Sequence, residues 1–161
     1  MQIMKLAEAL AERGELIKRS EHLKVRILAN ARHQDGESPA EDASALLSEY
    51  TIGLDRLEVL IRRINRTNSA ATVRDGTITD ALASRDVLRM RHKAISAAAD
   101  AASGRDQDRR YGPRQLRSEL VYVAALPVSE LRSTADDIAK RIRLVDLEIQ
   151  RVNWEFDLIE E

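Results

Sequence analysis

The chain has 161 residues, of which 43% are hydrophobic, 33% are charged and only 3% are aromatic, and its 26 basic residues nearly balance its 27 acidic ones. This length fits a single domain, residues 1–161, and the balanced charge gives no general attraction to nucleic acid or to anionic membranes. The chain contains no cysteine, which excludes disulfides, thiolate nucleophiles and Cys-based metal sites and is compatible with a reducing cytoplasm.

The start of the chain lacks the uninterrupted apolar core of a signal peptide, since Glu8, Glu12 and Glu15 fall within its apolar pattern. No run approaches the ~18 apolar residues of a membrane span. We therefore expect a cytoplasmic protein with no membrane partner.

The first half of the chain predicts two long amphipathic helices, at about 3–32 and 39–65. The first has an apolar face interrupted by polar residues: Ile3, Leu6, Leu10, Ile17, Ile27 and Ala31. The second is predicted to begin with a capping box in which Ser38 is the N-cap and Glu41 its partner. Its apolar face is nearly continuous: Ala43, Leu46, Tyr50, Leu54, Leu57, Ile61 and Ile64. Asn65 and Asn68 are expected to end it in left-handed backbone conformations.

A small β-hairpin is predicted across 71–79, because Asp75-Gly76 is a favoured hairpin turn. A third helix follows at about 80–103, with two adjacent apolar stripes. One consists of Ala83, Val87, Met90, Ala94, Ala97 and Ala101, and the other of Leu88, Ile95, Ala98 and Ala102. The apolar run 119–126 predicts a buried strand or extended segment that could pair with the hairpin.

The last helix, predicted at about 130–158, has the most regular heptad pattern: Leu131, Ala135, Ile138, Ile142, Val145, Ile149, Val152 and Phe156. A second apolar stripe lies well round the same helix: Leu144, Leu147, Trp154 and Leu158. A helix that is apolar on two faces must be covered on both. We therefore predict a mainly all-α protein, an antiparallel bundle of four long helices with a small β element, which forms a homo-oligomer through this second stripe.

Several short motifs resemble a bacterial family of uncharacterised helical proteins, some members of which are labelled septicolysin. They are INRTN at 64–68, Asp75-Gly76 before a Thr-capped helix, RDVLR at 85–89 and VNW at 152–154. The resemblance covers nearly the whole chain and implies no established chemistry. The label would imply a cytolytic toxin, but the sequence has neither an export signal nor a membrane-length apolar run, so we disfavour a cytolysin.

No catalytic motif is present: the sequence lacks G-x-S-x-G, a P-loop and a dinucleotide-binding glycine pattern. His22, His33 and His92 do not have metal-binding spacing. We expect no metal and no cofactor, and we lean towards a protein that is not an enzyme.

Two polar regions are candidate sites. The connection after the second helix could meet polar residues of the third and fourth helices, either as a ligand site or, as we favour, as a structural hydrogen-bond network. Its members are Asn65, Arg66, Thr67, Asn68, Arg85, Asp86, Asn153 and Trp154. If the network is structural, Arg66 should form a buried ion pair with Asp86 or with a neighbouring carboxylate.

The loop 103–117 is rich in arginine around one tyrosine: Arg105, Arg109, Arg110, Tyr111 and Arg114. Arginine beside an aromatic ring could contact single-stranded nucleic acid, although Asp106, Asp108 and Glu119 dilute the charge. An exposed loop or a docking surface for another subunit is the simpler interpretation.

The sequence therefore favours a non-catalytic, homo-oligomeric structural or protein-interaction module. The alternative is a small-ligand or nucleotide-binding protein, possibly enzymatic, that uses the polar connection 65–86 with Trp154. Nucleic-acid binding through 105–117 ranks third.

Overall fold

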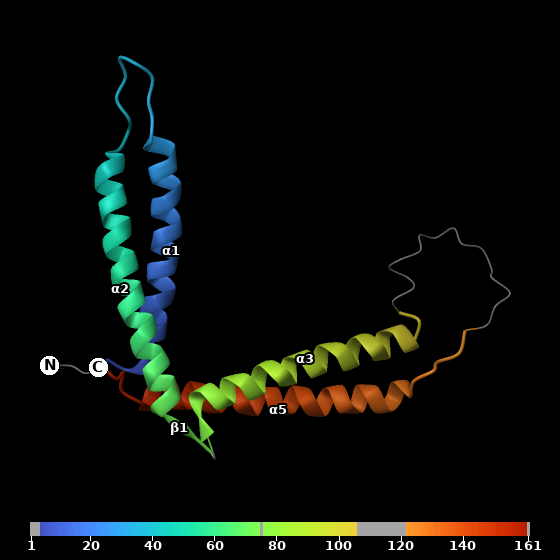
Figure 1. The fold of residues 1–161 in the computed structure, drawn as a ribbon. Coiled ribbons are helices and arrows are strands. Elements are labelled where there is room, and N and C mark those ends of the chain that lie inside the picture. Colours follow the sequence, from blue (N-terminus) through green and yellow to red (C-terminus); the bar gives the residue numbers. More distant parts are fainter. Residues whose placement is uncertain (1–3, 75, 106–121, 161) are drawn as a thin grey trace. The chain divides into compact units, whose positions relative to one another are not determined.

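The computed structural model describes residues 4–74, 76–105 and 122–160. Within these residues it contains four helices and one two-stranded antiparallel sheet, which confirms the mainly helical fold class with a small β element (Figure 1). The elements are α1 (Leu6–Asn30), α2 (Ala43–Ala70), β1 (Thr72–Val73), β2 (Gly76–Thr77), α3 (Ile78–Ala102) and α5 (Val128–Glu155). No helix in the described ranges is long and apolar enough to cross a membrane.

The contacts of the chain divide it into two compact units. Unit 1 contains Met1–Ile78 and Gln150–Glu161, and unit 2 contains Thr79–Ile149. The prediction of one domain over 1–161 stays a prediction, and each unit is described here by itself.

In unit 1, α1 and α2 form an antiparallel helical hairpin (Figure 1). In both helices, buried or half-buried residues recur at alternating intervals of three and four, the spacing of a two-helix coiled coil. In α1 they are Leu6, Ala9, Arg13, Leu16, Ser20, Leu23, Ile27 and Asn30, and in α2 Ala43, Leu46, Tyr50, Gly53, Leu57, Leu60, Ile64 and Thr67. The two helices therefore meet along regular heptad seams that include several polar side chains.

The start of α2 differs from the prediction. The helix begins at Ala43, and Asp42 is its N-cap: one carboxylate oxygen accepts hydrogen bonds from the backbone N–H groups of Ser44 at 2.8 Å and Ala45 at 3.1 Å. The predicted box of Ser38 and Glu41 is wrong, because the Glu41 carboxylate pairs with Arg26 of α1 instead. Because Glu41 forms an ion pair with α1, it is not available as the partner of Ser38 in a capping box.

Replacing Asp42 with alanine should destabilise the protein by about 1 kcal/mol, because two amide groups of the first turn lose their acceptor. Ser38→Ala is the matched control and should leave the melting temperature unchanged. Equal losses in the two variants, measured by thermal melts, would contradict this assignment of the cap.

The end of α2 also differs from the prediction. The helix continues through Asn65 and Asn68 to Ala70, so these asparagines do not terminate it in left-handed conformations. The next amide, that of Ala71, donates to Thr67 O at 2.7 Å. Left-handed backbone occurs instead at Arg74, with φ of 52°. The strands then pair in the register Thr72↔Thr77 and Val73↔Gly76, which confirms a hairpin within 71–79.

Segments from the two ends of the chain are joined in unit 1 by a short antiparallel pairing, which we call the terminal clasp. The Leu6 N–H donates to Phe156 O at 3.0 Å, and the Leu158 N–H donates to Met4 O at 2.8 Å. The Lys5 ammonium adds an ion pair of 2.6 Å with Asp157. Leu6 and Leu158 are both buried here, so the clasp lies against the core of the hairpin.

In unit 2, α3 and the part of α5 up to Ile149 lie side by side and antiparallel (Figure 1). Arg89 pairs with Asp146 at 3.2 Å, and Arg132 pairs with Asp100 at 3.0 Å, so residues early in one helix meet residues late in the other. The six residues of the predicted α5 heptad pattern that lie in this unit, from Leu131 to Ile149, are all buried or half-buried, as expected. The last two, Val152 and Phe156, belong to unit 1 and are also buried or half-buried.

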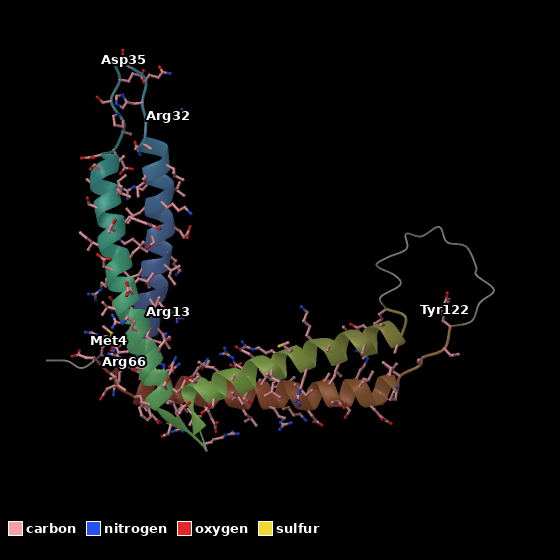
Figure 2. The ribbon with its side chains drawn as sticks, in the orientation of Figure 1. Met4, Arg13, Arg32, Asp35, Arg66 and Tyr122 are labelled. Atoms are coloured by element: carbon pink, nitrogen blue, oxygen red, sulfur yellow. The ribbon has the colours of Figure 1, made fainter. Side chains whose placement is uncertain are left out.

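The predicted buried strand at 119–126 lies partly outside the described residues. Residues 122–126 are described; they are exposed and form no strand, so the prediction is wrong for this part. Tyr122, 75% exposed, projects away from the helices of unit 2 (Figure 2).

Candidate interaction surfaces

Thr67 is the one member of the predicted polar network that is fully buried. Its hydroxyl donates to Arg63 O at 2.9 Å and accepts the Ile159 N–H at 3.0 Å. Because Ile159 directly follows the clasp, this hydroxyl fixes the C-terminal segment against α2. Thr67 therefore has a structural role that its position in the sequence did not reveal.

The other members lie nearer to solvent. Asn65 is exposed, Asn68 and Asn153 are half-buried, and Trp154 is 66% exposed. Arg85, in unit 2, has a side chain that is 22% exposed and lies 3.1 Å from Asp86 and 3.7 Å from Asp146. Both carboxylates that pair with Arg85 therefore belong to unit 2.

Arg66 does not form the buried ion pair that we expected. Its side chain is exposed on α2 near the open end of the hairpin, whereas Arg32 and Asp35 mark the closed end (Figure 2). Asp86 is also exposed, with 63% of its side chain accessible, and pairs with its neighbour Arg85. The expectation of a buried Arg66–Asp86 pair is therefore wrong.

Removing these two side chains should consequently have little effect. We expect Arg66→Ala and Asp86→Ala each to cost at most ~1 kcal/mol of unfolding free energy, because exposed ion pairs are weak. The losses should add in the double variant, as they do for independent sites. A single loss of about 3 kcal/mol or more in chemical denaturation would instead indicate a buried, coupled pair.

The arginine-rich loop falls almost wholly outside the described residues. Arg109, Arg110, Tyr111 and Arg114 lie there, and only Arg105 is described, as an exposed residue. Nucleic-acid contact through this loop stays a prediction.

The second stripe of α5 is exposed in part. Leu144, Leu147 and Trp154 are 54%, 62% and 66% exposed, respectively. Leu158 does not share this exposure: it is 5% exposed and belongs to the terminal clasp. The expected oligomer interface therefore loses Leu158, because the backbone pairing with Met4 turns that side chain into the core.

One flank of the α1–α2 hairpin carries three ion pairs, and we call it the charged flank. Glu12 pairs with Arg56, Arg19 with Glu49 at 2.6 Å, and Arg26 with Glu41. Hydrogen bonds from Arg26 hold the pKa of the Glu41 carboxyl below its usual value. The α1 members are spaced by seven residues, and each immediately precedes a seam residue.

On the opposite flank, five residues that each immediately follow a seam residue form what we call the neutral flank. They are aliphatic: Leu10 and Ile17 from α1, and Leu47, Leu54 and Ile61 from α2. The next position along this side of α1 is Lys24, which is charged and exposed. Leu10 is half-buried, and the other four are between 37% and 52% exposed. In an antiparallel coiled coil these positions border the seam on one side, as the ion-paired positions border it on the other. Three ion pairs thus line one flank of the hairpin, and five aliphatic side chains line the other.

Gly14 lies between Leu10 and Ile17 on the same face of α1. A β-carbon placed on Gly14 would meet no other atom of the described structure within 4 Å. Glycine inside a helix costs about 1 kcal/mol relative to alanine. The packing of the described residues therefore leaves open space beside Gly14, as it also does beside Gly53 of α2.

Comparison with known proteins gives a family and a structural relative. A model described as a family of unknown function (DUF6847) matches residues 4–158. The structure resembles the crystal structure of a functionally unknown conserved protein from Corynebacterium diphtheriae, with a TM-score of 0.88 and 39% sequence identity, over 98% of this chain and 100% of that one. A search of curated proteins finds no match. The name septicolysin appears in neither description, so these findings support the uncharacterised helical family but not that label.

Proposed function

We propose a role in self-association for this chain, which belongs to the family of unknown function DUF6847. In this proposal the protein is a homo-oligomeric structural or protein-interaction module, and two copies meet through their neutral flanks. The observation that carries the proposal is the asymmetry of the α1–α2 hairpin, whose charges pair on one flank while five aliphatic side chains line the other.

A second copy suits this flank for a physical reason. Residues such as Leu47 and Leu54 extend the seam sideways, so two hairpins placed flank to flank would share one apolar core of four helices. A two-fold axis brings the same patch of each copy together, so an uncharged patch meets its own equivalent without like-charge repulsion. The open space beside Gly14 would allow the two backbones to approach closely.

Burial of these side chains would also supply the driving force. Fully burying an exposed aliphatic side chain contributes roughly 1.5–3 kcal/mol. In the neutral flank, four side chains per copy are 37–52% exposed in the single chain, so burying the remainder of each contributes up to about half of that amount. Their removal from water on both copies favours association. This favourable free energy must exceed the free-energy cost of the translational and rotational entropy that the two chains lose on binding.

The mass of the protein in solution tests the proposal. Light scattering coupled to size exclusion at micromolar concentration should give at least twice the chain mass of 18.1 kDa. A mass of 18.1 kDa at high micromolar concentration would overturn the proposal.

A further inference from the structure

The outer face of α3, which points away from α5, carries a second heptad pattern. Its residues recur at intervals of four and three and are all exposed: Ala83, Val87, Met90, Ala94, Ala97 and Ala101. Val87 and Met90 are 49% and 72% exposed. The inner face already has its own pattern, formed by Leu88, Ile95, Ala99 and their neighbours. A helix that packs against one partner needs one such pattern, so the outer pattern fits a second helix.

The charges along one border of this outer face alternate in sign. Asp86, Lys93 and Asp100 each immediately precede an outer-face residue, at intervals of seven. The two aspartates pair with Arg85 and Arg132 while keeping 63% and 49% of their side chains exposed. Lys93 is exposed and makes no ion pair with any described residue. The other border holds Ser84, Arg91 and Ala98, with a single charge.

We propose that α3 of a second copy packs antiparallel on this outer face, as a self-contact separate from the neutral flank. In an antiparallel pair, the same border of each helix faces its equivalent in reverse order. In the alignment centred on Lys93, Lys93 of one copy would lie opposite Lys93 of the other. A shift of one heptad from this centred alignment places Lys93 of each copy opposite an aspartate of the other, Asp86 or Asp100. Arg91 then faces Ser84 or Ala98.

The centred alignment is disfavoured by the same charges, because Lys93 would face Lys93 and Asp86 would face Asp100. Like charges at such positions repel. The alternation of charge along this border therefore favours a second copy of α3 as the partner, packed with an offset of one heptad. The small side chains of Ala94, Ala97 and Ala101 permit close contact between the two helices.

The test uses the full chain with Ile17→Glu and Leu54→Glu introduced, which removes the neutral-flank contact. This background should still form a dimer, and Met90→Glu should reduce it to the monomer. Lys93→Glu should weaken the dimer about tenfold, because two attractive pairs become repulsive, and 1 M salt should diminish this effect. Arg91→Glu is the matched control and should change the dimerisation constant less than twofold.

A mixing experiment sharpens the test. The Lys93→Glu chain and a chain carrying Asp86→Lys and Asp100→Lys should each dimerise poorly alone but form a heterodimer when combined, since every facing pair is then attractive. A wild-type oligomer whose background variant is monomeric would overturn the α3 contact and leave the neutral-flank proposal standing. A dimer that responds to Arg91→Glu but not to Lys93→Glu would also overturn the antiparallel arrangement.

Discussion

Introducing Ile17→Glu together with Leu54→Glu should reduce the mass of the oligomer by at least half. Both side chains belong to the neutral flank and are 45% and 37% exposed in the single chain. A carboxylate placed there stays hydrated in the separated chains but would be buried without a partner in a flank-to-flank contact. We expect the dissociation constant of this contact to rise on the order of a hundredfold or more, as measured by light scattering over a concentration series.

A matched double variant separates this effect from a general loss of apolar surface. Val25 and Ile52 are 67% and 69% exposed but lie outside the neutral flank. Val25→Glu together with Ile52→Glu should therefore leave the mass unchanged. If this control dissociates the oligomer as strongly as the flank variant does, the neutral flank is not the interface.

Gly14→Ala gives a test in which stability and association should move in opposite directions. Alanine should raise the intrinsic stability of α1 by about 1 kcal/mol, and its β-carbon meets nothing in the single chain. In a close flank-to-flank contact the same carbon would separate the two backbones and weaken association. Higher stability with unchanged association would show that no molecule approaches Gly14.

Replacing Thr67 with valine should destabilise the protein by roughly 1–3 kcal/mol, although the two side chains have nearly the same shape. The buried hydroxyl accepts the Ile159 N–H at 3.0 Å, and valine leaves that amide without its acceptor. Thr67→Ser keeps the hydroxyl and should retain this hydrogen bond, losing only the packing of one methyl group. Chemical denaturation would measure both losses. A valine variant as stable as the serine variant would contradict the assigned role.

The hydrogen exchange of Ile159 provides a local readout of the same contact. Its amide should exchange faster in Thr67→Val than in Thr67→Ser, because only the serine variant retains an acceptor for it. Equal protection in both variants would mean that the clasp holds this segment without the hydroxyl.

The α5 heptad could be predicted from sequence because every seam position is apolar. In α1 the same spacing is harder to recognise, since Arg13, Ser20 and Asn30 occupy seam positions. The prediction therefore followed aliphatic residues such as Leu10 and Ile17, which lie on the neutral flank. In α2 the predicted face likewise included Leu54 and Ile61, one residue beyond the seam positions Gly53 and Leu60. Ion-pair partners at seven-residue spacing, such as Glu12, Arg19 and Arg26, were the signal that could have located the seam.

The terminal clasp and the role of Thr67 could not be predicted in this way. The Leu6–Phe156 and Thr67–Ile159 contacts join residues far apart in the sequence, and helical periodicity carries information only about near neighbours. For the same reason the polar character of Thr67 suggested a site or a network rather than an anchor for the C-terminal segment.

The terminal clasp also sets an order of events during protein synthesis. The α1–α2 hairpin depends mostly on contacts within the first 70 residues, so its helices can pair before the ribosome has finished translating the chain. The amide of Leu6 and the hydroxyl of Thr67 receive their final partners only after Phe156 and Ile159 have left the exit tunnel. The hydrogen bonds of the terminal clasp in unit 1 therefore form only after all of unit 2 has been synthesised.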